Sequence, residues 1–307
     1  MRRIIVLSLI LSLCFVLTNA AHGQGTPKKN VLTMGRVSDK ALKEQKQIEP
    51  IITYLASKLE DVGIERGEVV LMSDNDAVIE YLRKDKLDIV LETPFSAYLY
   101  KVEANVTPVL LAWRKGAGEY NSLIFVRKDS GIRRLEDLKG KVIAFEDPGS
   151  TSAYFLPMFS IKAKGLNLVE IESFDSPVPE GKIGYVFAGS ELNISGWVFF
   201  NNVDAGALSS TDWNDQGDNP RAYRKEFKII YETQKVPRML VAVRKGLDKK
   251  LVERIKEELL KMDKGEEGRK ALKGFKVKRF LELPGRPEDV LKPIEDLLIR
   301  ASAEKLR

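Results

Sequence analysis

The chain has 307 residues, of which 44% are hydrophobic and 31% charged, a balance typical of a soluble globular protein with room for two domains of ordinary size. Its formal net charge is only +6, and acidic residues are interspersed with the basic ones. A charge this small and this mixed argues against a nucleic-acid-binding protein.

The first 23 residues are predicted to be a secretory signal peptide. Two arginines precede an apolar run from Ile4 to Leu17, and small residues follow it. The run is short for a membrane span. We therefore expect cleavage between Ala20 and Gly23 and a periplasmic or otherwise extracytoplasmic product. Cys14 leaves a lipid anchor open, although the residue before it is not small.

Removal of this leader would change the chemistry available to the chain. The only cysteine, Cys14, and the only histidine, His22, leave with the leader or lie at its edge. The mature chain then has no Ser-His or Cys-His nucleophile pair and no His or Cys metal ligand, so we expect no cofactor and no metal ion. Loss of Arg2 and Arg3 leaves a net charge of +4.

Predicted strands alternate with predicted helices, which indicates a parallel α/β sheet. β-Prone runs predict strands at residues 31–34, 69–71, 87–91, 106–113, 120–126, 142–145, 168–171, 203–208, 227–231 and 239–243. Apolar spacing predicts helices at residues 48–59, 74–83, 133–140, 192–200, 251–262 and 290–298, with Pro50 near the start of the first. Residues 177–184 are predicted to be a loop.

The segment from Lys141 to Pro157 contains the strongest functional signal. A short strand and an Asp-Pro-Gly turn precede three hydroxyl residues, Ser150, Thr151 and Ser152, which open a helical pattern that Pro157 is expected to kink. Such hydroxyls either cap the helix or bind an oxyanion at its positive end. A dipole end supplies only about 1–2 kcal/mol, whereas micromolar affinity needs roughly 8 kcal/mol. Other parts of the chain must therefore complete any site.

A second candidate segment runs from Thr93 to Tyr98 and includes Ser96. It follows a predicted strand and begins a predicted helix, which is where open α/β sheets bind ligands. The alternative interpretation is a turn followed by a packed aromatic residue.

The order of the predicted strands suggests two lobes joined by two crossing segments. We expect residues 30–120 and 237–307 to form lobe 1 and residues 121–236 to form lobe 2. Two lobes joined in this way can close over a ligand.

The run from Asn121 to Pro157, NSLIFVRKDSGIRRLEDLKGKVIAFEDPGSTSAYFLP, resembles the phosphate/phosphite/phosphonate solute-binding proteins of ABC importers. The similarity spans nearly all of the mature chain, and its DPxSTS core is quite specific. The resemblance implies a two-lobed periplasmic-binding-protein-like (type II) α/β fold with two crossover strands and the ligand in the interlobe cleft. It further implies that Ser150, Thr151 and Ser152 hold ligand oxyanions and that Tyr120 lies nearby.

The chain departs from the family pattern at other expected cleft positions. Thr93 stands where the family usually has the Gly of a Gly-Pro turn, and Tyr98 is displaced by one position. Glu191 stands where the family usually has His, and Ser209 where it has Asp. Glu191 either points to solvent, pairs with the ammonium group of a zwitterionic ligand, or indicates a ligand that is not a phosphonate.

The leading functional hypothesis is therefore a secreted, monomeric protein that captures a small oxyanion of the phosphonate, phosphite or phosphate class in an interlobe cleft. It delivers this ligand to the permease of an ABC importer. One alternative is a ligand-sensing module that docks on a membrane receptor or kinase. Another is a carboxylate enzyme that uses Glu146, Asp147 or Glu191 as acid and base, although the absence of His and Cys from the mature chain argues against an enzyme.

Overall fold

The computed structural model describes residues 30–38 and 41–303. The predicted signal peptide, with Cys14 and His22, lies outside these residues. No helix in the described part of the chain is both long and apolar enough to cross a membrane.

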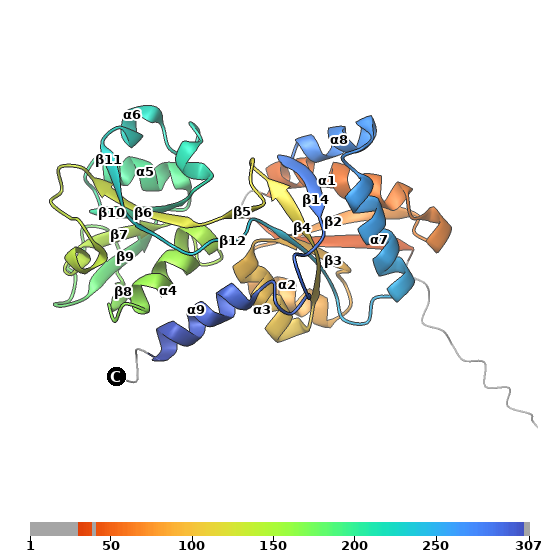
Figure 1. Ribbon diagram of the computed structural model, residues 1–307, viewed down its shortest axis with the longest axis horizontal. Helices are drawn as coiled ribbons and strands as arrows, with labels where there is room; N and C mark the ends of the chain where they lie inside the picture. The colour runs from red at the N-terminus through yellow and green to blue at the C-terminus, as the bar shows by residue number, and fades with distance from the viewer. Residues whose placement is uncertain (1–29, 39–40, 304–307) are drawn as a thin grey trace, which may run out of the picture.

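Two six-stranded sheets form the two lobes of the molecule, which lie side by side in Figure 1. The sheet of lobe 1 has the strand order β14-β4-β13-β3-β1-β2. Its strands are β1 (Val31–Val37), β2 (Arg66–Met72), β3 (Ile89–Glu92), β4 (Thr107–Arg114), β13 (Leu240–Val243) and β14 (Val277–Leu281). The helices of this lobe are α1 (Ala41–Ser57), η1 (Glu60–Val62), α2 (Asn75–Arg83), α3 (Pro94–Ala104), α7 (Lys249–Lys261) and α8 (Glu266–Lys273).

The sheet of lobe 2 has the strand order β11-β6-β10-β7-β9-β8. Its strands are β6 (Ser122–Arg127), β7 (Val142–Phe145), β8 (Leu168–Glu170), β9 (Ile183–Phe187), β10 (Ala205–Ser209) and β11 (Phe227–Glu232). The helices are η2 (Leu135–Leu138), η3 (Thr151–Phe155), α4 (Leu156–Lys162), α5 (Glu191–Phe199), η4 (Asp212–Asn214) and α6 (Arg221–Arg224).

A short antiparallel ribbon of β5 (Glu119–Tyr120) and β12 (Val236–Pro237) connects the lobes (Figure 1). The last helix, α9 (Lys292–Ala303), packs against α3 of lobe 1 and α4 of lobe 2. The predicted two-lobed α/β fold with two crossover strands is therefore confirmed.

Helices cover both faces of each sheet, which explains why the central strands are apolar throughout. In lobe 1, one face packs against α1, α7 and α8, and the other against α2 and α3. In lobe 2, one face packs against α4 and the other against α5. Gly206 in β10 permits the α5 contact, because a Cβ there would lie 2.5 Å from a methyl carbon of Ile194.

The prediction of a parallel sheet was wrong in both lobes, because both sheets are mixed. Strand β13 is antiparallel to β3 and β4, and β6 is antiparallel to β10 and β11. These are the strands that follow the two crossings directly, so each enters its sheet from the connecting ribbon without a helical crossover to reverse its course. The predicted strand at residues 120–126 is divided, since Tyr120 belongs to the ribbon and Ser122 begins β6.

Two further local predictions were wrong. Helix α1 begins at Ala41, so Pro50 lies inside it rather than near its start. Its first two turns are mostly polar and contain no buried residue, and the buried apolar stripe that marks a helix in the sequence begins only at Ile48. The predicted loop at residues 177–184 ends too late, because β9 begins at Ile183 and pairs with β7 and β8.

Candidate functional site

The hydroxyl-rich segment begins a helix at the carboxyl end of β7. The Ser150 side chain caps this helix by accepting a hydrogen bond from the Ala153 N–H at 3.1 Å. The first turn is π-helical, with the Phe155 N–H donating to the Ser150 carbonyl at 2.9 Å, and α4 continues from Leu156. Single π turns of this kind are frequent at functional sites. Pro157 lies at the start of α4.

Thr151 links this helix start to lobe 1. Its Oγ1 accepts a hydrogen bond from the Phe95 N–H at 3.0 Å and lies 3.0 Å from the Thr93 hydroxyl oxygen. Thr93 is the N-cap residue of α3, and its own side chain makes no capping hydrogen bond. The positive ends of two helices, one from each lobe, therefore meet at Thr151. Two such ends are a ready-made environment for an anion.

Tyr120 lies in the connecting ribbon beside this point and is buried. Burial raises the pKa of its phenol, while the hydroxyls of Thr151 and Ser152 lie close enough to oppose that rise. The phenol oxygen nevertheless has no partner within hydrogen-bonding geometry among the described residues. A buried hydroxyl without a partner is costly, which indicates that Tyr120 is available to a ligand.

Two arginines, Arg238 and Arg114, lie near each other, with Arg238 beside Tyr120. The Arg238 guanidinium carbon is 4.5 Å from the centroid of the Tyr120 ring. Arg114, at the end of β4, stacks over Phe275 at 4.2 Å from the ring centroid and donates from Nε to the Phe275 carbonyl at 3.0 Å. Burial lowers the pKa of Arg114 to about 9, and the nearby charge of Arg238 adds to this effect. The cleft therefore carries positive charge beside its helix starts.

An acidic cluster lies on the lobe 2 side of the cleft and is joined to lobe 1 by Lys115. The Lys115 Nζ is 2.6 Å from an oxygen of Asp212 and 3.1 Å from one of Asp218. Burial alone would raise the pKa of Asp212, but the charges of Lys115 and Arg238 hold it below its ordinary value. The main-chain N–H of Lys115 donates to the Lys276 carbonyl in lobe 1 at 3.0 Å. This ion pair therefore spans the two lobes.

Glu146 and Glu191 form the rest of this cluster. Burial raises the pKa of Glu146 well above its ordinary value, and the Glu191 carboxyl adds to the rise. Burial also raises the pKa of Glu191, with Asp212 and Asp218 contributing. Glu191 is thus half-buried among acidic groups, following the N-cap residue Ser190 of α5, and does not extend freely into solvent.

The remaining predicted residues occupy different surroundings. Ser96 is buried in the first turn of α3, close to the Tyr100 hydroxyl. Tyr98 packs against residues of α9. Burial raises the pKa of the Tyr98 phenol, and the charge of Glu295 in α9 adds to this rise. Ser209 is buried and donates to an Asp212 oxygen at 2.5 Å, so it positions the acidic cluster.

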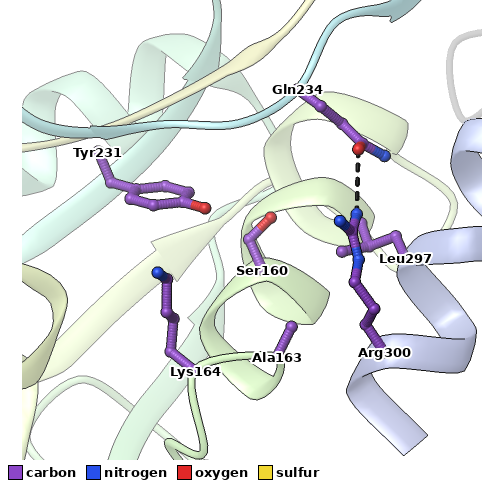
Figure 2. A pocket seen from close by; sticks show the side chains of 7 residues that line it. All are labelled: Ser160, Ala163, Lys164, Tyr231, Gln234, Leu297 and Arg300. Carbon is purple, nitrogen blue, oxygen red and sulfur yellow. Dashed lines mark hydrogen bonds between the residues drawn. The ribbon is translucent and has the colours of Figure 1, made fainter.

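A separate cavity of about 310 Å³ lies at the far end of α4, where this helix meets β11 and α9. Figure 2 shows Gln234 there, which accepts from Arg300 Nη2 at 3.0 Å and donates to the Pro293 carbonyl at 2.6 Å. Ser160, which lines this cavity, is nine residues along the helix from Thr151, or about 13 Å. This cavity is therefore distinct from the cleft site.

Sequence reasoning did not assign ligand roles to Arg238, Arg114 or Lys115, or a structural role to Asp212. The only available signal was position, since Arg114 and Lys115 directly follow the strand predicted at residues 106–113, and Arg238 follows the crossing strand β12. The described residues contain no group of three or more His, Cys, Asp or Glu side chains arranged to hold a metal ion.

These features define the class of protein. Two α/β lobes joined by two short strands enclose hydroxyls, helix starts and arginines between them, as in a two-lobed solute-binding protein.

Comparison with known proteins gives the family. Residues 38–284 match the family described as "ABC transporter, phosphonate, periplasmic substrate-binding protein", and the chain belongs to this family. The "Phosphate-import protein PhnD" of Mycolicibacterium smegmatis is 24% identical over 210 residues, which cover 66% of this chain and 63% of that protein. The "Phosphonates-binding periplasmic protein" of Escherichia coli is 26% identical over 245 residues, which cover 78% of this chain and 68% of that protein.

Among solved structures, XAC2383 from Xanthomonas citri bound to chloride ion is 32% identical, with a TM-score of 0.85. The match covers 90% of this chain and 99% of that one. The same protein bound to ATP is similar to this chain with a TM-score of 0.83. The expected membership of the phosphonate-binding family is confirmed.

Proposed function

We propose that this protein is an extracytoplasmic solute-binding protein that captures a small oxyanion of the phosphate, phosphite or phosphonate class. The ligand binds between the lobes and is delivered unchanged to an ABC importer. The single observation that carries this proposal is the meeting of two helix starts from opposite lobes at Thr151. An anion placed there contacts both lobes at once, so its binding favours the closed form.

The relatives support the ligand class. The mycobacterial protein is named for phosphate import and the E. coli protein for phosphonate binding, and one structure of the Xanthomonas protein contains ATP. All three ligands carry a phosphorus oxyanion. The family consists of binding proteins of transporters, which supports a role without catalysis for this chain.

The partners follow from the same role. We propose that the signal peptide directs export, that the mature chain acts as a monomer, and that its ligand-closed form docks on an ABC transporter permease. Lobe closure creates a surface that the open form lacks, which allows a permease to distinguish loaded protein from empty protein.

Isothermal titration calorimetry with phosphate, phosphite, methylphosphonate and sulfate tests this function. We expect the mature protein to bind at least one phosphorus oxyanion with micromolar or better affinity. Thr151→Val keeps the side-chain shape and removes the hydroxyl, and it should weaken that binding roughly tenfold or more. Ser160→Ala, on the same helix but at the separate cavity, should bind like the wild type. No binding of any phosphorus oxyanion by the wild type would refute the proposed function.

A further inference from the structure

Arg238 is a buried charged residue whose guanidinium has no hydrogen-bond or ion-pair partner among the described residues. Its side chain follows β12, and the residue is only 5% exposed. The main-chain N–H donates to the Gly118 carbonyl at 2.8 Å, but the guanidinium makes no hydrogen bond and no ion pair with any described residue. Its Nε is fully buried and unpaired.

Arg36, a second buried arginine, differs from Arg238 because its guanidinium forms ion pairs. Its Nε is 2.7 Å from Glu44, and its Nη1 is 3.2 Å from Glu92. Two carboxylates therefore compensate the buried charge of Arg36. Among the described residues, no carboxylate lies within 4.0 Å of the Arg238 guanidinium, although burying an unpaired charge is among the costliest arrangements in a protein.

The surroundings of Arg238 are those of the oxyanion site. Its guanidinium lies over the ring of Tyr120, whose phenol oxygen is also buried and unpaired. That phenol lies beside the hydroxyls of Thr151 and Ser152. Two orphaned polar groups thus lie together at the helix start, and both are hydrogen-bond donors. Among the described groups nearby, Asp212 is already paired with Lys115 at 2.6 Å.

We propose that Arg238 is a ligand-binding residue of the cleft, which donates to the oxyanion together with the Tyr120 hydroxyl and makes the site prefer a doubly charged ligand to a singly charged one. This inference rests on the proposed function and specifies its ligand further. Each helix start carries roughly half a positive charge, so two of them balance about one negative charge. The full charge of Arg238 balances a second one. Its planar fork matches two oxygens of a phosphoryl group.

The test compares two anions of the same shape at about pH 8.5. Methylphosphonate then carries two negative charges, whereas methanesulfonate carries one. Titration calorimetry of the mature wild type should show methylphosphonate bound more tightly than methanesulfonate. Arg238→Gln should weaken methylphosphonate roughly ten- to hundredfold and methanesulfonate less, so the preference shrinks. Arg238→Lys should recover part of the preference because it restores the charge without the fork.

Arg279→Gln is a matched control. Arg279 also has a buried, unpaired Nε and lies over an aromatic ring, that of Trp113 at 5.3 Å, but it belongs to β14 at the edge of the lobe 1 sheet. Its substitution should leave both affinities unchanged. Thermal unfolding of each variant confirms that it is folded, and Tyr120→Phe provides a second, milder test by weakening methylphosphonate.

The outcomes separate this inference from the proposed function. If the wild type binds methylphosphonate but Arg238→Gln binds it within twofold as well, this inference is overturned and the proposed function stands. Equal weakening of both anions would show a structural role for Arg238 and would also overturn it. If the wild type binds none of the phosphorus oxyanions, the proposed function fails and this inference fails with it.

Discussion

The Lys115 ion pair allows a quantitative prediction about lobe closure. Lys115 belongs to the turn after β4 in lobe 1, whereas Asp212 and Asp218 belong to lobe 2. The Lys115 and Asp212 side chains are only 16% and 4% exposed, and their charged atoms are 2.6 Å apart. The ion pair is therefore largely shielded from water. Because its partners belong to different lobes, it forms only while the lobes are close together.

Lys115→Met removes the charge and keeps much of the side-chain length. Removal of one partner from a buried ion pair costs about 3–5 kcal/mol. We take the lower end of this range here, because the charge of Arg238 still favours the ionised form of Asp212 after Lys115 is removed. Here the protein can avoid that cost by opening, since opening returns Asp212 to water. Taking about 3 kcal/mol as the loss to the closed form, the ratio of closed to open molecules falls roughly 100-fold.

Small-angle X-ray scattering of the ligand-free protein measures this change directly. We expect a larger radius of gyration for Lys115→Met than for the wild type, and a weaker affinity for the oxyanion in calorimetry because binding must then supply the free energy of closure. Lys276→Met is the control. It removes an ion pair of 3.5 Å to Asp215, on the same lobe 2 loop, whose side chains are 61% and 31% exposed. Such pairs contribute about 0–1 kcal/mol.

A single result would refute this reasoning. If Lys115→Met has the scattering curve and the affinity of the wild type while Asp212 and Asp218 are unchanged, the ion pair does not hold the lobes together. An equal response of Lys276→Met would show that any charge on this loop has the same influence, and that burial is irrelevant to the effect.

Two further predictions concern the acidic cluster. Burial, and then the charge of Glu191, raises the pKa of Glu146 in the folded protein, so folding favours the protonated carboxyl. The stability that protonated Glu146 contributes is fully present below the ordinary pKa of about 4.5 and is lost as the pH rises through the raised pKa. Glu146→Gln should therefore raise the melting temperature at pH 8 but barely change it at pH 4, and an equal difference at both pH values would contradict this sign. Glu191→Gln should weaken 2-aminoethylphosphonate several-fold more than phosphate if the cluster holds an ammonium group, and calorimetry showing equal effects on the two ligands would remove that idea.

Much of the fold could be predicted from local sequence. The apolar runs of β3, β7 and β10 and the helical spacing of α5 and α7 are signals within a few residues of each other. Strand direction could not be predicted in the same way. It depends on where the chain returns after each crossing, which is a property of segments far apart in the sequence.

The same distinction between local and long-range contacts applies to the candidate site. The DPxSTS segment was visible because its turn, cap residue and helix start are consecutive in the chain, and the structure places Ser150 at the cap. The role of Thr151 was only half visible, because its partners Thr93 and Phe95 are 58 and 56 residues away. From the sequence alone, a hydroxyl residue at a helix start is interpreted as a cap, because the position of the opposing helix start is not known.

Arg238 marks the limit of reading a site from sequence. An arginine after an apolar pair is an ordinary surface residue by composition, and nothing adjacent to it suggests burial. It becomes buried because β12 pairs with β5, which brings Val236 opposite Tyr120 across the ribbon. That pairing places a full charge over an aromatic ring and beside a helix start, with no carboxylate among the described residues close enough for an ion pair. The feature that makes Arg238 a candidate for ligand binding is therefore the absence of an expected partner, and such an absence exists only in the folded chain.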